Sequence, residues 1–273
     1  MSSYQGAIDW SQVAASNYTF AFARVSDGTS TLDPTFLTNY AGIKAAGMAA
    51  GAYQFFEPGE DPVAQADELL AAIGPLASGD LAPMLDVEVT GGQSKATIIQ
   101  NIDIWVNTVE AGLGVAPIIY TSPGYWDSEV DSNAFSADPL WVANWGVAQP
   151  TIPFGWTPDR LTGWTFWQYS DDGSVNGIAG SVDLDRFNGS ITALDEFLAD
   201  PPPPVPPNYV PPSNSGPNPG PGGPGGLASG PANIPDNGSA IALFVLSLAG
   251  LAALQLRLAT GPRHRSHSRT IAE

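Results

Sequence analysis

The chain has 273 residues, a formal net charge of −18 at pH 7 and no cysteine. The absence of cysteine excludes disulfides, thiolate nucleophiles and cysteine metal ligands, and the acidic balance argues against nucleic acid, since phosphate binding requires clustered Lys and Arg. Both histidines, His264 and His267, lie in the C-terminal tail. Histidine-based triads and zinc sites are therefore excluded from residues 1–200, which leaves carboxylates as the acid-base groups there. We expect no metal and no cofactor.

Residues 1–200 alternate strand-like and helix-like segments. The predicted strands are Phe20–Val25, Ala49–Phe56, Ala82–Val89, Ala116–Ser122, Leu140–Trp145 and Gly163–Ser170, and the predicted helices are Pro34–Gly47, 61–74 and 95–112. Such alternation indicates an α/β fold in which helices wrap a parallel sheet. The number of repeats suits a βα (TIM-like) barrel better than an open sheet. The scarcity of helix in the later part predicts an irregular barrel.

The strongest chemical signal is LDVE, at the end of the predicted strand Ala82–Val89. Residues two apart on a strand face the same way, so Asp86 and Glu88 point together, with Cβ atoms roughly 6–7 Å apart. In a βα barrel this end of the strand is the active-site face. Paired carboxyl groups push each other's pKa values apart, which glycosidic bond cleavage requires. A solvated strand end and a Ca²⁺ ligand pair are the alternatives.

Aromatic residues cluster at or near the ends of the later strands, in YTSPGYW, WVANW and WTFWQYS. Sugar rings stack their C–H faces on aromatic planes, so these clusters suit a carbohydrate groove, although single aromatics more often lie in a core. Trp141 and Trp145 share one face of their predicted strand. In SVDLDRF, Asp183 and Asp185 also share a face, and Arg186 is positioned to neutralise one of them as a structural ion pair.

The C-terminal quarter has a different composition. Residues 201–233 are a Pro/Gly-rich linker, and residues 234–273 combine a short motif, an apolar stretch and a basic tail. The apolar stretch, residues 239–256, is near the lower limit for a membrane-spanning helix, and the arginines after it predict a cytoplasmic C-terminus. A buried core helix is the alternative. The motif Ile234-Pro235-Asp236-Asn237-Gly238 resembles the VPDSG variety of PEP-CTERM sorting signals, departing by Ile for Val and Asn for Ser.

The resemblance to a sorting signal implies export to the cell surface or envelope, at least transient anchoring by the helix, and processing by C-terminal sorting machinery. The membrane and that machinery are therefore expected partners. The domain boundaries that follow are a barrel over residues 1–200, the linker over 201–233 and the tail over 234–273.

The motifs of residues 1–190 together resemble glycoside hydrolase family 25, the lysozymes of the Chalaropsis type. They are SSYQGAIDW, FAFARVSDGTSTLDPTF, GAYQFF, LDVE, PIIYTSPGYW, PLWVANWG, TFWQYS and GSVDLDRFNG, in family order. The resemblance implies a flattened barrel that cleaves the β-1,4 bond from N-acetylmuramic acid to N-acetylglucosamine in peptidoglycan glycan strands.

The resemblance also implies roles for individual residues. Glu88 corresponds to the proton donor and Asp86 to its charged partner, which either orients the substrate acetamido group as an internal nucleophile or acts directly on the sugar cation. Asp183 corresponds to a late active-site aspartate, whereas Asp185 stands where the family often has Asn. Tyr53, Tyr120 and Trp145 are the groove candidates.

The family usually begins this region with Gly-Ile-Asp-Val-Ser, and Met1 stands at the Val position. Asp9 belongs to the later IDW motif. We therefore expect that a first-strand aspartate, most of that strand and a signal peptide precede Met1 in a longer gene product.

Three other functions compete with a lysozyme. The first is a catalytically impaired peptidoglycan-binding module without the first-strand aspartate. The second is a chitinase, whose Asp-x-x-Asp-x-Asp-x-Glu signature fails here because Leu81 and Met84 occupy the two upstream acid positions. The third is a surface-display protein in which the barrel is only a scaffold.

Overall fold

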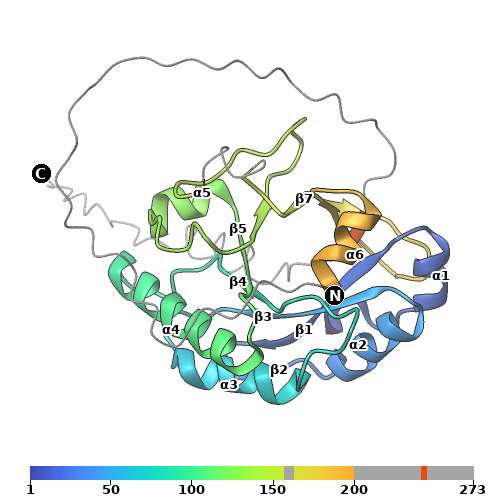
Figure 1. The fold of residues 1–273 in the computed structure, drawn as a ribbon, viewed down its shortest axis with the longest axis horizontal. Helices are drawn as coiled ribbons and strands as arrows, with labels where there is room; N and C mark the ends of the chain where they lie inside the picture. Colours follow the sequence, from blue (N-terminus) through green and yellow to red (C-terminus); the bar gives the residue numbers. More distant parts are fainter. Residues whose placement is uncertain (157–162, 200–240, 245–273) are drawn as a thin grey trace, which may run out of the picture.

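The computed structural model describes residues 1–156, 163–199 and 241–244 (Figure 1). Its strands are β1 (Phe20–Asp27), β2 (Thr31–Leu32), β3 (Ala49–Phe55), β4 (Met84–Asp86), β5 (Ile118–Thr121), β6 (Leu140–Ala143), β7 (Phe166–Gly173), β8 (Val182–Phe187) and β9 (Ile241–Phe244). Its helices are α1 (Trp10–Ala15), α2 (Phe36–Ala45), α3 (Pro62–Ile73), α4 (Lys95–Leu113), α5 (Pro123–Tyr125) and α6 (Ile191–Ala199), with short helical turns at Ser3–Gln5 and Trp126–Val130.

The strands form one curled sheet. Its order is β1-β3-β4-β5-β6-β7-β8-β9, with β2 added outside β1 and a further pairing between β9 and β1. Strands β1 and β3 to β7 run parallel, and β8 is antiparallel to both of its neighbours. This confirms the α/β fold with a barrel-like sheet, and the reversed β8 is its main irregularity.

The helices follow from local sequence signals. Asp61 caps α3 by accepting hydrogen bonds from the Val63 and Ala64 N–H groups, and Pro62 occupies the first helical turn, where no N–H partner is needed. Ser94 caps α4 in the same way, and Gly114 ends it with φ 72°. In Figure 1, α2, α3 and α4 lie side by side along one flank of the sheet, whereas the chain from β5 to β7 is mostly loop.

Two apolar clusters hold the domain together. One cluster lies between the sheet and its helices and includes Ala21, Leu85, Ile102 and Trp105. The other fills the inside of the curled sheet. Residues next to each other on a strand belong to different clusters, because strand side chains alternate between faces. The inner cluster therefore determines which part of the barrel interior is left for a functional site.

The slot between β1 and β8 is filled from two parts of the chain. Strand β9 pairs with β1 at Phe20 and Ala21 and with β8 from Asp183 to Arg186. Beyond it, the Met1 amino group donates to the Phe22 carbonyl and the Met1 carbonyl accepts from the Arg24 N–H, each at 2.7 Å. Met1 thus pairs with the part of β1 that follows the residues paired with β9.

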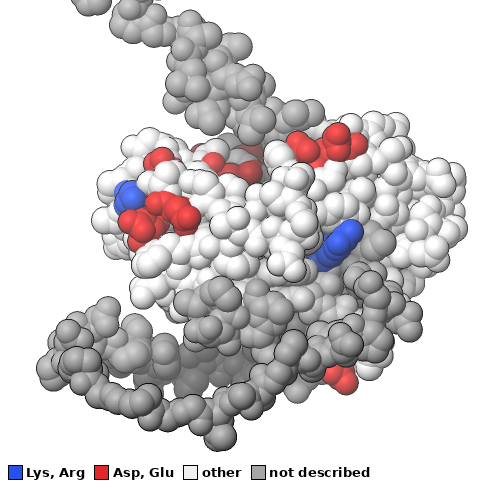
Figure 2. Space-filling model, turned by 90° about the horizontal axis from the view of Figure 1, so that it is seen from above, with Lys and Arg blue, Asp and Glu red and all other residues white. Residues whose placement is uncertain are grey.

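The C-terminal prediction differs from the structure at four residues. Residues 239–256 were predicted to be a helix, but Ile241–Phe244 form a strand with backbone partners on both sides. The other residues of that segment and the predicted linker 201–233 lie outside the described residues. Within the described ranges, no helix is both long and apolar enough to span a membrane. Figure 2 shows acidic side chains in several patches over one face, with few basic ones among them.

Candidate active site

Large aromatic side chains close the inside of the barrel at one level. Phe22 and Trp141 lie 4.8 Å apart and Trp141 and Phe166 lie 4.9 Å apart, measured between ring centroids. Phe20 joins them at 5.2 Å from Phe166. All four rings are fully buried. We call these four residues the aromatic floor, and a site inside the barrel must lie above it.

Polar side chains follow the aromatic floor on the same strand faces. On the parallel strands other than β6 they come two residues later, toward the carboxyl end. On the antiparallel β8 they come before the floor-level Phe187. This polar rim consists of Arg24, Tyr53, Asp86, Glu88, Tyr120, Gln168, Asp183 and Asp185. Every member is buried except Glu88, which is half-buried. Because side chains two residues apart on a strand share a face, these polar residues lie directly next to the apolar core on the inside of the barrel.

The predicted pair Asp86 and Glu88 lies at the end of β4. The Val87 N–H donates to the Tyr120 carbonyl at 2.9 Å, so extended backbone continues past Asp86 and Glu88 stays beside it. Burial raises the pKa of Glu88 to about 8, and the contact with Asp86 acts against this rise. Burial and then the nearby Glu88 charge raise the pKa of Asp86 well above its usual range. Two carboxyl groups this close do not both ionise near neutral pH, so the pair retains a proton.

Arg24 is the buried cation of the polar rim. Its Nε donates to Asp33 Oδ2 at 3.1 Å, and the two side chains are 4% and 0% exposed. The same Asp33 oxygen accepts the Ser3 N–H at 2.9 Å. The positive charge of Arg24 acts to lower the pKa of Asp86. Asp33 therefore fixes the Arg24 guanidinium beside Asp86, where its positive charge acts against the rise in the Asp86 pKa that burial and Glu88 cause.

Strand β8 brings two more carboxyl groups into the barrel. Asp183 lies close enough to Asp86 for its charge to add to the rise in the Asp86 pKa that burial and Glu88 cause. Asp185 Oδ1 accepts the Trp141 Nε1–H at 2.9 Å, so Asp185 is tied to the aromatic floor. The expectation that Arg186 neutralises one of them is wrong. Arg186 lies on the opposite face of β8, with its guanidinium carbon 4.6 Å from the Tyr169 ring centroid.

The predicted groove aromatics take different positions. Tyr53 and Tyr120 are buried at 1% and 0% exposure, whereas Trp145 is 38% exposed. Burial, followed by the charges of Glu88 and Asp86, raises the pKa of Tyr120 well above its usual range, which places its hydroxyl beside the acid pair. Trp141, which shares a face with Trp145, belongs to the aromatic floor. Trp145 is therefore the predicted aromatic with a ring surface open to a ligand.

Sequence reasoning missed Arg24 and Gln168. The signal for Arg24 was present in FAFARV, where it follows Phe20 and Phe22 at intervals of two and must share their face. Gln168 stands two residues after Phe166 in TFWQYS by the same rule. Among the described residues, no group of three or more His, Cys, Asp or Glu is arranged to hold a metal ion.

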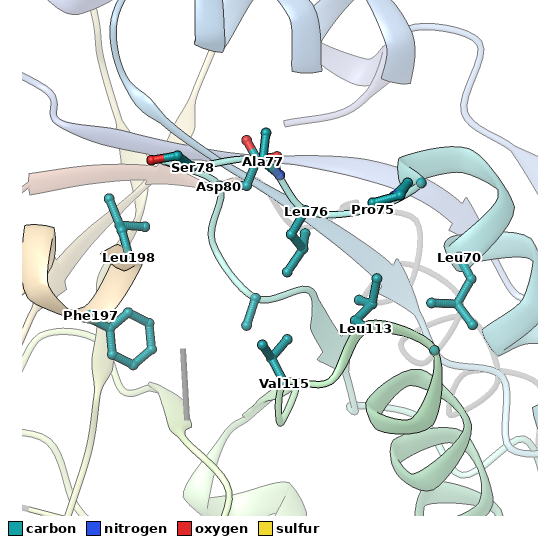
Figure 3. Close-up of a pocket in the computed structure, with 13 residues that line it drawn as sticks. Leu70, Pro75, Leu76, Ala77, Ser78, Asp80, Leu113, Val115, Phe197 and Leu198 are labelled. Carbon is teal, nitrogen blue, oxygen red and sulfur yellow. Dashed lines mark hydrogen bonds between the residues drawn. The ribbon is translucent and has the colours of Figure 1, made fainter. Parts of the chain in front are cut away.

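A cavity lies among the segments that precede β4 and β5 and the ends of α3, α4 and α6 (Figure 3). Its volume is about 600 Å³, and its lining is mostly apolar, including Leu76, Leu113, Val115 and Phe197. Its one acidic residue, Asp80, is paired with Lys44 at 2.7 Å. Because the lining residues precede the strands or end the helices, the aromatic floor separates this cavity from the acid pair, and the one acidic residue of the lining is engaged by Lys44.

Comparisons with known proteins agree with this geometry. The sequence model described as glycosyl hydrolases family 25 matches residues 1–178. Lysozyme M1 of Streptomyces globisporus is 35% identical over 205 residues, which are 71% of this chain and 68% of the relative. The N,O-diacetylmuramidase of Chalaropsis sp is 36% identical over 203 residues, which are 67% of this chain and 93% of the relative. A crystal structure of a bacterial lysozyme from Streptomyces coelicolor superposes with a TM-score of 0.68 at 34% identity, covering 73% of this chain and 94% of that one.

Proposed function

The chain belongs to glycosyl hydrolases family 25 and is a glycoside hydrolase, and we propose that it is an N-acetylmuramidase. Its substrate is the peptidoglycan glycan strand, and the bond cleaved is the β-1,4 bond from N-acetylmuramic acid to N-acetylglucosamine. The observation that carries this proposal is the acid pair at the end of β4. Burial raises the pKa of one of its carboxyl groups, Glu88, to about 8, and the second, the fully buried Asp86, lies beside it with a pKa well above its usual range.

Glu88 is the proton donor. A general acid must hold its proton at the working pH, and burial raises the pKa of Glu88 to about 8, so that most of the population is protonated at pH 7. Glu88 is also the more exposed member of the pair. Its proton passes to the glycosidic oxygen as the bond from that oxygen to C1 breaks, which releases the N-acetylglucosamine hydroxyl.

Asp86 is the charged partner, and Arg24 supports its ionised form. Two routes fit this role. In one, Asp86 accepts the acetamido N–H of the substrate while the acetamido oxygen bonds to C1. In the other, the carboxylate stabilises the sugar cation directly. In both routes water then adds at C1 and returns a proton to Glu88. Apart from the contact with Glu88, neither Asp86 oxygen has a hydrogen-bond partner among the described residues.

The remaining predicted residues have supporting roles. Asp183 adds negative charge beside Asp86, which favours the positively charged transition state. Trp145 is the platform on which a sugar ring stacks. Tyr53 and Tyr120 are buried, so they shape the base of the groove and position the acid pair instead of presenting an open ring.

The test is Glu88→Gln, which keeps the shape of the side chain and removes the transferable proton. We expect release of muropeptides from purified sacculi to fall by at least about 10²-fold, with unchanged circular dichroism. The matched control is Glu196→Gln, on exposed α6, which should retain full activity. Mass spectrometry of the products should show muramic acid at the reducing end. Unchanged release by the Glu88→Gln variant would refute the assignment, and a wild-type protein that binds sacculi without cleaving them would support the binding-module alternative.

We propose in addition that the segment 234–273 directs export and anchoring at the cell envelope. The support is the sequence order of motif, apolar stretch and basic tail. Insertion of residues 239–256 into a membrane requires Ile241–Phe244 to leave the sheet, because one segment cannot be both strand and membrane helix. Fractionation of the native cells tests this proposal: the full chain should be found with the envelope, and a chain ending at Asp200 should not.

A further inference from the structure

Gln168 joins two residues of the site that are far apart in the sequence. It lies on β7, is fully buried, and has one oxygen that accepts two hydrogen bonds. The Trp145 Nε1–H donates to Gln168 Oε1 at 2.8 Å, and the Tyr120 hydroxyl donates to the same oxygen at 3.1 Å. Trp145 is open to ligand, whereas Tyr120 lies beside the acid pair. A single amide oxygen therefore links the sugar platform to the catalytic end of β4.

The backbone strengthens this link. Asn144 donates its N–H to the Gln168 carbonyl at 3.1 Å, and the Trp167 indole donates to the Asn144 carbonyl at 2.8 Å. The peptide that carries Trp145 is thus held against β7 directly before the indole leaves the sheet. Rotation of the exposed ring about its side-chain torsions remains, and the bond to Gln168 Oε1 is what restricts it.

The functional atom of Gln168 is its oxygen. Gln168 Nε2 is buried and has no hydrogen-bond partner within the described part of the chain. Leaving a buried donor unpaired costs free energy, so hydrogen bonding by the amide nitrogen does not explain why a glutamine stands here. The orientation that satisfies both indole and phenol is retained in spite of that cost.

We infer that Gln168 is a positioning residue that holds the Trp145 ring as a saccharide platform in fixed relation to Asp86 and Glu88. This inference rests on the proposed function. The ligand at Trp145 is a sugar ring of the glycan strand, stacked on the indole face. Gln168 itself does not touch the reacting atoms. It acts through Trp145, and it reduces the ordering that the platform must undergo when the sugar binds.

The experiment measures binding in the Glu88→Gln background, so that cleavage does not interfere. The probe is a soluble muropeptide chain prepared from sacculi, and the readout is its dissociation constant by calorimetry. Gln168→Met keeps the length of the side chain and removes the acceptor oxygen, and we expect binding to weaken about tenfold. Gln168→Glu retains an acceptor oxygen, and at pH 5, where burial keeps the new carboxyl neutral, it should restore most of the affinity.

A double-mutant comparison identifies the path of the effect. Trp145→Ala should weaken binding at least as much as Gln168→Met, and adding Gln168→Met to Trp145→Ala should change nothing further, because the two residues act as one unit. Additive losses, or unchanged binding in folded Gln168→Met, would overturn the inference. If Gln168→Met does not fold, Trp145→Phe replaces it as the test, because phenylalanine keeps a ring and loses the donor. Absence of any muropeptide binding by the Glu88→Gln parent would instead refute the proposed substrate.

In the cleaving enzyme the same role predicts a distinct kinetic signature. Loss of a platform that binds the ground state and the transition state equally raises KM and leaves kcat almost unchanged. Gln168→Met should therefore raise KM about tenfold with kcat within about twofold of the parent. A fall in kcat with unchanged KM would contradict a positioning role through Trp145.

Discussion

At the scale of single residues, the chemistry of this site depends on unequal surroundings for two similar groups. Asp86 and Glu88 have related side chains and lie two positions apart on one strand. Asp86 is fully buried, and burial and Glu88 raise its pKa well above its usual range against the opposing charge of Arg24, whereas Glu88 is half-buried and its pKa is raised to about 8. Burial and fixed neighbours, and not the residue types, therefore determine how far the pKa of each carboxyl group is shifted.

This arrangement predicts the pH dependence of the rate. Glu88 must be protonated to act as the acid, so kcat/KM should fall tenfold per pH unit above about pH 8. Initial rates on fluorescently labelled sacculi between pH 5 and 10 measure this limb. A descending limb near pH 5 would mean that Glu88 is not the protonated group.

The same pKa shift predicts the pH dependence of stability. Between the unfolded pKa, about 4.3, and the folded value near 8, the native state binds more protons than the unfolded state, so stability is lost as pH rises. Gln does not titrate. Glu88→Gln should therefore be more stable than the parent at pH 8 and nearly equal to it at pH 4, by urea denaturation. Equal stability at both pH values would indicate an unshifted pKa.

At the scale of secondary-structure elements, the strands combine a solid base with a reactive rim. On β1, β4, β5 and β7 the interior face carries an apolar residue near the level of the aromatic floor and a polar residue two positions later. This placement requires close packing at the floor. Gly51 on β3 stands directly opposite Phe22 on β1, and a Cβ at Gly51 would overlap the Phe22 ring.

Gly51→Ala should therefore destabilise the barrel. Because the ring of Phe22 is packed against Trp141, it has no free space into which to move, and we expect a loss of about 1–3 kcal/mol in the free energy of unfolding. Urea denaturation measures the loss. Gly124→Ala is the matched control, since a Cβ there meets nothing within 4 Å, and its effect should stay within about 0.5 kcal/mol. Equal effects of the two substitutions would show that the aromatic floor accommodates the added methyl group without a specific loss of stability.

At the scale of the whole molecule, closure of the sheet involves residues separated by almost the entire chain. Strand β9, at Ile241–Phe244, pairs with both β1 and β8, and without it those two strands would present open edges there. Exposed strand edges lower stability and promote association between chains. The catalytic domain as described thus extends beyond the predicted boundary near residue 200.

A chain ending at Asp200 tests this extension. We expect it to be soluble and folded, because the aromatic floor and the polar rim lie within residues 1–199, and to melt at a lower temperature. Loss of about 2 kcal/mol of pairing lowers Tm by roughly 4–8 °C in a domain of this size. The matched full-length variant is Leu243→Pro, which removes a backbone donor of β9 and should lower Tm in the same direction. An unchanged Tm in both chains would show that β9 contributes nothing, and an insoluble truncated chain would refute the boundary.

The sequence by itself determined the order and type of most elements and the acid pair. Hydrophobic periodicity and helix caps are local, so α2, α3, α4 and the strands β1 and β3 to β7 were predicted to within a few residues, whereas the two-residue β2 was not predicted. Asp86 and Glu88 were predicted to lie together because their relation needs only the period of a single strand. The family followed from motifs in sequence order, which the comparisons confirmed.

Only the tertiary structure decided which residues of different strands meet. The reversed direction of β8 brings Asp183 to the carboxyl edge and turns Arg186 outward, so that Arg24 supplies the buried charge. The tertiary structure also decides that Trp141 lies in the aromatic floor and Trp145 at the rim, and that Ile241–Phe244 belong to the sheet. The physical reason is that periodicity fixes the face on which a side chain lies, whereas the neighbours and directions of strands depend on pairing between segments far apart in the chain.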